Sequence, residues 1–436
     1  MGSTRRLIGL ALGALALVAT ATVPAYAHDP STPEGKAEAA ELTREYVPSW
    51  VAGPKITGQP TPCVNGKADK YLCKNVDLLS FLPHSQLGGG STSSSMWNWT
   101  DSTTQNEYII YCRSNGVSFI NVTDASNPKY LGNLPAANGT SSTWCDVRVY
   151  QDHAYIGKDT VNAGIQVFDL RRLRGVTTTQ TFTADAQYAG LTNSHTLWIN
   201  TETGYLYVSG ANTCNKGLTI LDIHDLLVPK QVACYDKEVY SHEAIVLNYH
   251  GPDTRFAGRE ICFNFAGQGK KFQILDVTDK ANIKVLSSAT YSGASFTHQG
   301  YPTPDMKYLV MNDETISTTG GSPDFVWNIE KLDALTLVGV DKSSRGEFIS
   351  HNGYIVGNRH YQAAYKGGLR IMDTSAASSA KLPEVGFFDI NPSSDANGFS
   401  DTWMINPYLK NGVIAVQGMG VGLFLVKPTG AAVGTR

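Results

Sequence analysis

The sequence predicts an all-β fold, namely a seven-bladed β-propeller that is closed by its N-terminal strand. The first observation is a short apolar strand, in most copies preceded by Gly and followed by Asp, that recurs seven times. The copies occupy residues 116–124, 164–169, 217–222, 271–276, 324–329, 368–373 and 422–426. Their starts are 48, 53, 54, 53, 44 and 54 residues apart. A unit of about 50 residues made of short strands is the period of a propeller blade.

Composition is the second observation. The chain of 436 residues carries only 17% charged residues and contains 42 Gly. Such a chain favours a β core with tight turns over disorder. The formal net charge is −3 and no basic run stands out. We therefore expect no nucleic-acid partner.

The third observation is the strand order within a unit. Blade two shows a first strand at 145–150, a second at 154–157 and a third at 164–169, and blade six repeats this order. The last blade has supplied only three strands by residue 426. Residues 74–83 (KNVDLLSFLP) resemble the fourth strand of blade one at 128–135. We expect residues 74–83 to complete the last blade, because ring closure removes open sheet edges.

The N-terminus has the pattern of an export signal. Arg5 and Arg6 precede an apolar run at 7–18, and Ala25-Tyr26-Ala27 fits a cleavage site. The predicted organisation is a signal peptide at 1–27, a leader at 28–62, the propeller at 63–428 and a tail at 429–436. The pattern does not decide between two export routes. We expect a secreted, extracellular monomer without a membrane anchor.

Export permits disulfides, and the chain has seven cysteines. Cys63 and Cys73 would close a small loop before the first strand. Cys214 and Cys234 flank the third strand of blade three and would tie strands of one blade. Because the count is odd, at least one thiol is left over, and the other pairings stay open.

Four of the ten histidines occupy one equivalent position. Aligning the innermost strands places a hydroxyl residue and then a histidine at the start of four consecutive blades, at His195, His242, His298 and His351. The same position holds Ser95, Cys145 and Asp401 in the other blades. Since these strands begin at one rim of the channel, the four imidazoles would face one end of the axis.

Several converging imidazoles suit zinc, copper, iron or nickel. The chain returns to this rim after every second strand, where Lys158-Asp159 and Asp313-Glu314 lie. Carboxylates there would complete the ligand set or orient the imidazoles. The candidate acid–base residues are Glu243, Asp313, Glu314 and Asp401. The predicted cofactor is one divalent transition metal, namely copper, iron or zinc.

Two plainer interpretations compete with a metal site. Repeats copy residues by duplication, so the shared histidine could be inherited packing that caps each strand start. Asp124 and Asp279, in the two VTD motifs, are expected to stabilise turns after the third strand, with calcium binding as a weaker alternative. Two points favour function: four of only ten histidines share one position, and four protonated imidazoles would repel one another without a metal or anion among them.

Long stretches of the chain resemble a known family. They are residues 73–83 (CKNVDLLSFLP), 249–263 (YHGPDTRFAGREICF) and 297–301 (THQGY), together with GLRIMD and GLFLVKP. The chain resembles the secreted LVIVD-repeat proteins, specifically the choice-of-anchor B family, over roughly residues 63–428. The resemblance implies an exported propeller with a variable C-terminal anchor. Relative to that family, Ser95 replaces an acid and Cys145 replaces an arginine.

Two functions follow as hypotheses. The first is a metal-dependent enzyme of the oxidase, oxygenase or polysaccharide lyase type, acting on an extracellular polymer, glycan or small molecule at the rim. The second is a non-catalytic extracellular scaffold that binds a glycan or a protein. Metal content separates the two hypotheses.

Overall fold

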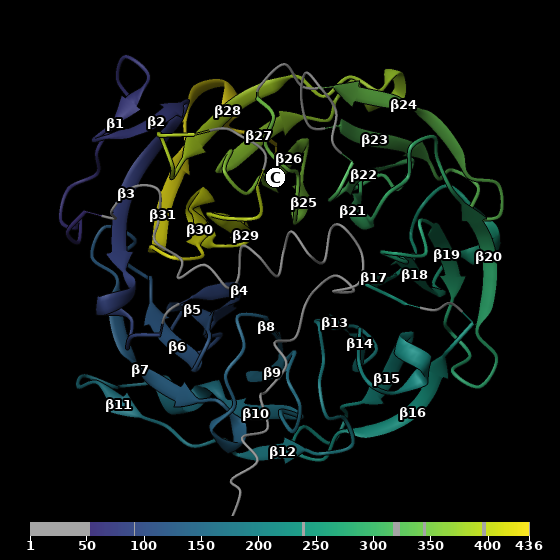
Figure 1. Cartoon of the computed structure of the whole chain (residues 1–436), viewed down its shortest axis with the longest axis horizontal. Helices are drawn as coiled ribbons and strands as arrows, with labels where there is room; N and C mark the ends of the chain where they lie inside the picture. The colour runs from purple at the N-terminus through teal and green to yellow at the C-terminus, as the bar shows by residue number, and fades with distance from the viewer. Residues whose placement is uncertain are drawn as a thin grey trace, which may run out of the picture.

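Seven sheets surround a central channel in the computed structural model (Figure 1). The structure describes residues 53–90, 92–237, 240–316, 323–342, 346–394 and 398–435. The predicted signal peptide and residues 28–52 of the predicted leader lie outside these ranges. None of the described helices is both long and apolar enough to cross a membrane.

Each blade contains four antiparallel strands, which are arranged side by side from the channel to the outside of the ring. Blades one to three consist of β4 (Ser93–Thr100), β5 (Glu107–Arg113), β6 (Gly116–Asn121) and β7 (Lys129–Pro135); β8 (Cys145–Tyr150), β9 (His153–Lys158), β10 (Ile165–Asp169) and β12 (Ala186–Tyr188); and β13 (Thr196–Asn200), β14 (Tyr205–Ser209), β15 (Leu218–Asp222) and β16 (Lys230–Tyr235).

Blades four to seven follow the same order. They consist of β17 (Glu243–Asn248), β18 (Glu260–Phe265), β19 (Phe272–Asp276) and β20 (Lys284–Ala289); β21 (Thr297–Pro302), β22 (Tyr308–Asp313), β23 (Pro323–Asn328) and β24 (Thr336–Lys342); β25 (Gly353–Val356), β26 (Arg359–Ala363), β27 (Leu369–Asp373) and β28 (Glu384–Asp389); and β29 (Thr402–Asn406), β30 (Ile414–Gly418), β31 (Gly422–Pro428) and β3 (Val76–Pro83).

The connections include short 3-10 helices of three or four residues. They are η1 (His84–Gln86), η2 (Ala137–Gly139), η3 (Leu170–Leu173), η4 (Cys214–Lys216), η5 (Thr254–Phe256), η6 (Ala377–Ser379), η7 (Lys410–Gly412) and η8 (Gly430–Ala432).

The predicted ring closure is confirmed. β3 pairs antiparallel with β31, from Val76 opposite Pro428 to Pro83 opposite Gly422. The first long strand of the chain therefore forms the outer strand of the last blade (Figure 1).

One detail of the predicted N-terminal strand is wrong. Lys74 belongs to a separate strand, β2 (Tyr71–Lys74), which pairs with β28 at the outside of blade six. Asn75 has a left-handed backbone with φ 54°, and this turn redirects the chain into blade seven. β1 (Lys67–Ala68) extends the blade-six sheet, and β11 (Gln180–Thr181) pairs with β7 of blade one.

The VTD aspartates act in turns after the third strand. Asp124 accepts a hydrogen bond from the backbone N–H of Ser126 at 3.0 Å, and Asp279 accepts one from Ala281 at 3.0 Å. Asp222 accepts the N–H of His224 in the same way. These bonds support the turn interpretation over calcium binding.

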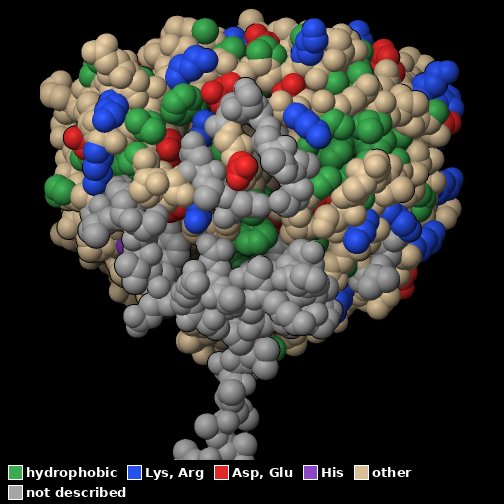
Figure 2. Space-filling view, turned by 45° about the horizontal axis from the view of Figure 1, so that its top comes forward, with side chains coloured by type: hydrophobic (Ala, Val, Ile, Leu, Met, Phe, Trp, Pro, Cys, Tyr) green, Lys and Arg blue, Asp and Glu red, His purple; other side chains and the backbone are tan. Residues whose placement is uncertain are grey.

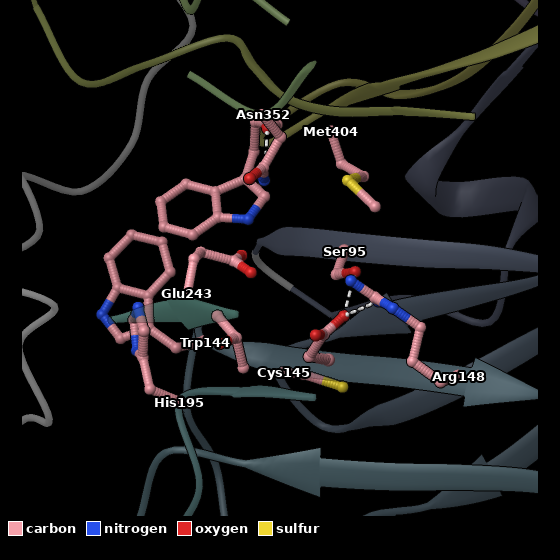
Figure 3. Close-up of a pocket in the computed structure, with 11 residues that line it drawn as sticks. Ser95, Trp144, Cys145, Arg148, His195, Glu243, Asn352 and Met404 are labelled. Atoms are coloured by element: carbon pink, nitrogen blue, oxygen red, sulfur yellow. Dashed lines mark hydrogen bonds and ion pairs between the residues drawn. The ribbon is translucent and has the colours of Figure 1, made fainter. Parts of the chain in front are cut away.

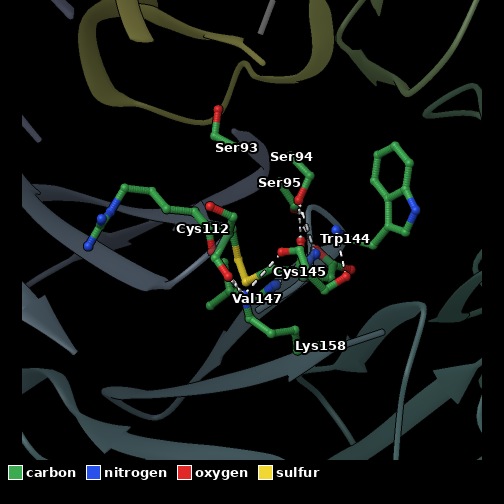
Figure 4. The surroundings of a disulfide bond; sticks show 12 residues. Ser93, Ser94, Ser95, Cys112, Trp144, Cys145, Val147 and Lys158 are labelled. Carbon is green, nitrogen blue, oxygen red and sulfur yellow. Dashed lines mark hydrogen bonds between the residues drawn. A yellow bond between two sulfur atoms is a disulfide. The ribbon is translucent and has the colours of Figure 1, made fainter. Parts of the chain in front are cut away.

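Both predicted disulfides are present, and a third pair joins Cys112 to Cys145. The third disulfide links β5 of blade one to β8 of blade two (Figure 4). It places a covalent bond between neighbouring blades at Cys145, which the sequence alignment puts at the rim position that carries histidine in four other blades. The seventh cysteine, Cys262, is a buried free thiol whose pKa is raised by burial.

The surface carries mixed charge. On the face shown in Figure 2, Lys and Arg side chains are scattered and do not gather into one basic patch. The two signs nearly balance over the whole chain, with 35 Lys and Arg against 38 Asp and Glu.

We expect the closure strand to contribute strongly to stability. Phe81 of β3 is fully buried and stacks on Phe424 of β31, with ring centroids 4.4 Å apart. Phe81→Ala should lower the free energy of unfolding by about 3–5 kcal/mol in urea denaturation, because it leaves a cavity across the closing pair. Val64→Ala, at an exposed site, is the control and should change it by less than about 0.5 kcal/mol. Equal changes in the free energy of unfolding for the two variants would contradict a strong contribution of the closure strand to stability.

His84 should make the fold sensitive to acid. Its Nε2 lies 3.1 Å from Ser93 Oγ and 3.2 Å from Tyr111 Oη, and burial, together with the Arg113 charge, lowers its pKa to about 4. Between about pH 6.5 and 4 the unfolded chain binds a proton here that the folded chain does not. Up to about 3 kcal/mol of stability is therefore lost as the pH falls through this window.

The test is the pH dependence of urea unfolding for His84→Asn. The variant should lose less stability than the parent between pH 6.5 and 4, whatever its stability at neutral pH. Curves of the two proteins that run parallel over this window would contradict the assignment.

Candidate metal centre

The four rim histidines lie side by side around one end of the channel. The backbone N–H groups of His195, His242 and His351 donate to the carbonyl oxygens of Ser209, Phe265 and Ala363 on the second strand of their own blades, at 2.9–3.0 Å. Ring centroids are 4.7 Å apart for His195 and His242, 4.6 Å for His242 and His298, and 4.1 Å for His298 and His351. The four residues are at most 3% exposed.

A carboxylate completes the arrangement. Glu314 directly follows β22 and is 2% exposed. Potential ligand atoms of His242, His298 and Glu314 all lie within 4.8 Å of one another. Two imidazoles and one carboxylate form a donor set that binds zinc or non-haem iron in proteins.

Groups outside the cluster hold the imidazoles from their Nδ1 side. His195 Nδ1 lies 3.1 Å from Asp159 Oδ2, and His351 Nδ1 lies 2.7 Å from the carbonyl oxygen of Trp403. A carboxylate and a carbonyl only accept hydrogen bonds, so both Nδ1 atoms carry the hydrogen. When these rings are neutral, Nε2 carries no hydrogen and has a free lone pair. An imidazole binds a metal through such a nitrogen.

Glu314 is itself oriented by hydrogen bonding. The Tyr365 hydroxyl donates to Glu314 Oε1 at 2.7 Å. The same oxygen lies 3.4 Å from His351 Nε2, and Oε2 lies 3.8 Å from His298 Nε2. Tyr365 has φ 39°, a value that bulky residues rarely adopt.

The other predicted acid–base residues occupy different surroundings. Asp313 accepts hydrogen bonds from the Tyr291 hydroxyl and from the backbone N–H groups of Ser295 and Phe296. Asp401 accepts from Asn391 Nδ2 at 2.7 Å. Of the four candidate acids, Glu314 is the one that the structure brings into the histidine cluster. Glu243 lines a small cavity together with His195.

A narrow cavity lies in the channel next to His195. Figure 3 shows His195 and Trp144 on one side, Arg148 on the other, and Glu243 between them. The cavity has room for about one water molecule. Burial raises the pKa of Glu243 to about 8, although the Arg148 charge opposes the rise.

Arg148 and Asp146 form a buried ion pair at the wall of this cavity. Arg148 Nη1 lies 2.6 Å from Asp146 Oδ1, and Ser95 Oγ donates to the same oxygen at 2.5 Å. The Arg148 guanidinium also stacks over Trp97 at 4.3 Å. An aromatic layer packs against Arg148, with neighbouring ring centroids 5.5–6.2 Å apart. It consists of Trp97, Trp198, Tyr301, Tyr354 and Tyr408.

Some site residues are not indicated by any pattern in the sequence, namely Tyr365, Asp146 and Arg148. The aromatic layer does have a sequence signal, because Trp198, Tyr301 and Tyr354 each follow a rim histidine by three residues. The others carry no repeated pattern: Asp146 and Arg148 both lie on β8, and Tyr365 follows β26.

Comparisons with known proteins support the fold. No family model matches the sequence, and no curated protein matches it significantly. Among 1155 matching chains of solved structures is the "Structure of U3-55K", with a TM-score of 0.53 and 9% sequence identity, covering 81% of this chain and 98% of that chain. At this identity the likeness shows the fold alone. The chain is thus a seven-bladed β-propeller protein with a buried histidine–glutamate cluster.

We expect the Arg148–Asp146 pair to be required for stability. Arg148→Met leaves the Asp146 carboxylate buried without its cation and should cost about 3–5 kcal/mol in urea denaturation. Arg148→Met with Asp146→Asn should recover at least about 1 kcal/mol of that loss. Arg172→Met, which breaks an exposed pair with Asp185, is the control and should cost less than about 1 kcal/mol. A double variant as unstable as the single one would contradict this account.

Proposed function

We propose that the protein is an exported propeller that binds a divalent transition metal at one end of its channel. The observation that carries the proposal is the close grouping of potential ligand atoms from His242, His298 and Glu314 within 4.8 Å. His195 and His351 flank this group as predicted ligands. The cluster is buried, and buried groups of this polarity favour a bound cation that compensates the carboxylate.

The chemistry of the donors limits the metal. Imidazole and carboxylate suit zinc and iron, and an imidazole-rich site also binds copper. The Nδ1 contacts of His195 and His351 support this assignment, because metal-binding histidines usually donate their second ring N–H to a carboxylate or carbonyl. We favour zinc or iron over copper because Glu314 is part of the group.

A metal-dependent enzyme is the activity that we propose for this centre. A transition metal takes four or more ligands, so a three-ligand site leaves positions for water or substrate. The substrate would be an extracellular polymer, glycan or small molecule, and the reaction an oxidation or a polysaccharide elimination. Glu243, next to His242 and beside the cavity, is placed to act in proton transfer.

Export and family membership are part of the same proposal. The N-terminal sequence pattern and three disulfides support an oxidising, extracellular location. The resemblance to the LVIVD-repeat, choice-of-anchor B proteins remains a proposal on its sequence motifs. The alternative function is a non-catalytic scaffold for a glycan or protein, in which the histidines only line the channel.

Metal content tests the proposal. Protein secreted into rich medium should contain about one equivalent of copper, iron or zinc by mass spectrometry. His242→Ala with His298→Ala removes two imidazoles of the group and should lose the metal. His224→Ala with His250→Ala also removes two histidines, both at exposed sites, and should keep it.

Two results would contradict the proposal. One is a parent protein without stoichiometric metal after reconstitution with zinc, iron or copper. The other is equal metal content in the two double variants. Either result would leave the scaffold as the better function.

A further inference from the structure

His195 is held differently from the other three histidines. Its Nδ1 faces a carboxylate, Asp159 Oδ2, at 3.1 Å, and its side chain is 1% exposed. Its Nε2 has no hydrogen-bond partner among the described residues. A buried imidazole nitrogen in that state is costly unless a cation or a donor meets it.

Contacts other than the one to His195 hold Asp159 in place. Its Oδ1 accepts a hydrogen bond from Asn193 Nδ2 at 2.8 Å, and its backbone N–H donates to the Trp144 carbonyl at 3.0 Å. The second carboxylate oxygen is therefore aimed at His195 by contacts within the rim. Asp159 belongs to blade two and His195 to blade three, so the contact also crosses a blade boundary.

The absence of a side chain at Gly210 leaves room for His195. Gly210 has φ +63°, and a Cβ atom added there would lie 2.6 Å from His195 Cβ. Gly267 repeats this arrangement in the next blade, with φ +49° and an added Cβ 3.0 Å from His242 Cβ. The two neighbouring imidazoles thus sit in equivalent glycine-lined places.

We propose that Asp159 is a positioning residue of the metal centre, which holds His195 so that its Nε2 serves as a further ligand. The metal is the divalent transition ion of the proposed function, on which this inference rests. The ring of His195 is 4.7 Å from that of His242, and the three-ligand group leaves coordination positions to fill. Carboxylate–histidine–metal chains of this kind fix the imidazole tautomer and increase metal affinity.

The experiment measures zinc affinity of the metal-free full chain by competition with a chromophoric chelator. Asp159→Ala should weaken zinc binding about 10–100-fold, and Asp159→Asn, which keeps an acceptor oxygen, should weaken it less. His195→Ala should weaken binding at least as much as Asp159→Ala. The double variant should bind no more weakly than His195→Ala, because Asp159 acts through His195.

The chain offers a matched control. Asp222 makes the same carboxylate contact to a histidine Nδ1, that of His224, at 2.6 Å on an exposed turn. Asp222→Ala should leave zinc affinity unchanged. Thermal unfolding of every metal-free variant separates ligand positioning from a purely structural role, which would lower stability and leave zinc affinity at the parent value. The absorption spectrum of the cobalt(II)-substituted protein should also change in Asp159→Ala.

Failure of this inference is distinguishable from failure of the proposed function. Parent-like zinc binding by Asp159→Ala, or losses from Asp159→Ala and His195→Ala that add in the double variant, would overturn the inference alone. A parent protein that binds no zinc, iron or copper would overturn both.

Discussion

The antiparallel pairing of β3 with β31 is the contact on which the rest of the architecture depends. It joins the first long strand to the last blade and removes the open edge that the ring would otherwise present. Closure fixes the innermost strands around one axis with their starts at one rim. Histidines about 50 residues apart in the sequence thereby become neighbours with ring centroids 4.1–4.7 Å apart.

The channel buries several polar and charged side chains. Imidazoles, a carboxylate and an arginine–aspartate pair lie out of contact with water, where unpaired polar groups are costly. Hydrogen bonds from neighbouring blades meet part of this cost, as those to His195, His351 and Glu314 illustrate. The aromatic layer around Trp97 packs against Arg148 of the arginine–aspartate pair. The metal ion that we propose would supply a positive charge to the histidine–glutamate group.

Repetition explains what the sequence predicts well. The blade number, the closure, the placement of the four histidines and the turn aspartates all follow from patterns that recur about every 50 residues. Structural features that occur only once in the chain are harder to predict from the sequence. The left-handed turn at Asn75 moves Lys74 into another blade. The Cys112–Cys145 disulfide joins strands of neighbouring blades. One residue of register decides that Glu314 meets the histidines while Asp313 binds backbone N–H groups.

The most direct test of the proposed metal centre is X-ray absorption spectroscopy at the metal edge of the purified protein. We expect nitrogen and oxygen ligands at about 2.0–2.2 Å, with the outer-shell scattering of at least two imidazoles. A spectrum of a hydrated ion without imidazole scattering, or of a sulfur-ligated ion, would contradict a metal bound by His242, His298 and Glu314.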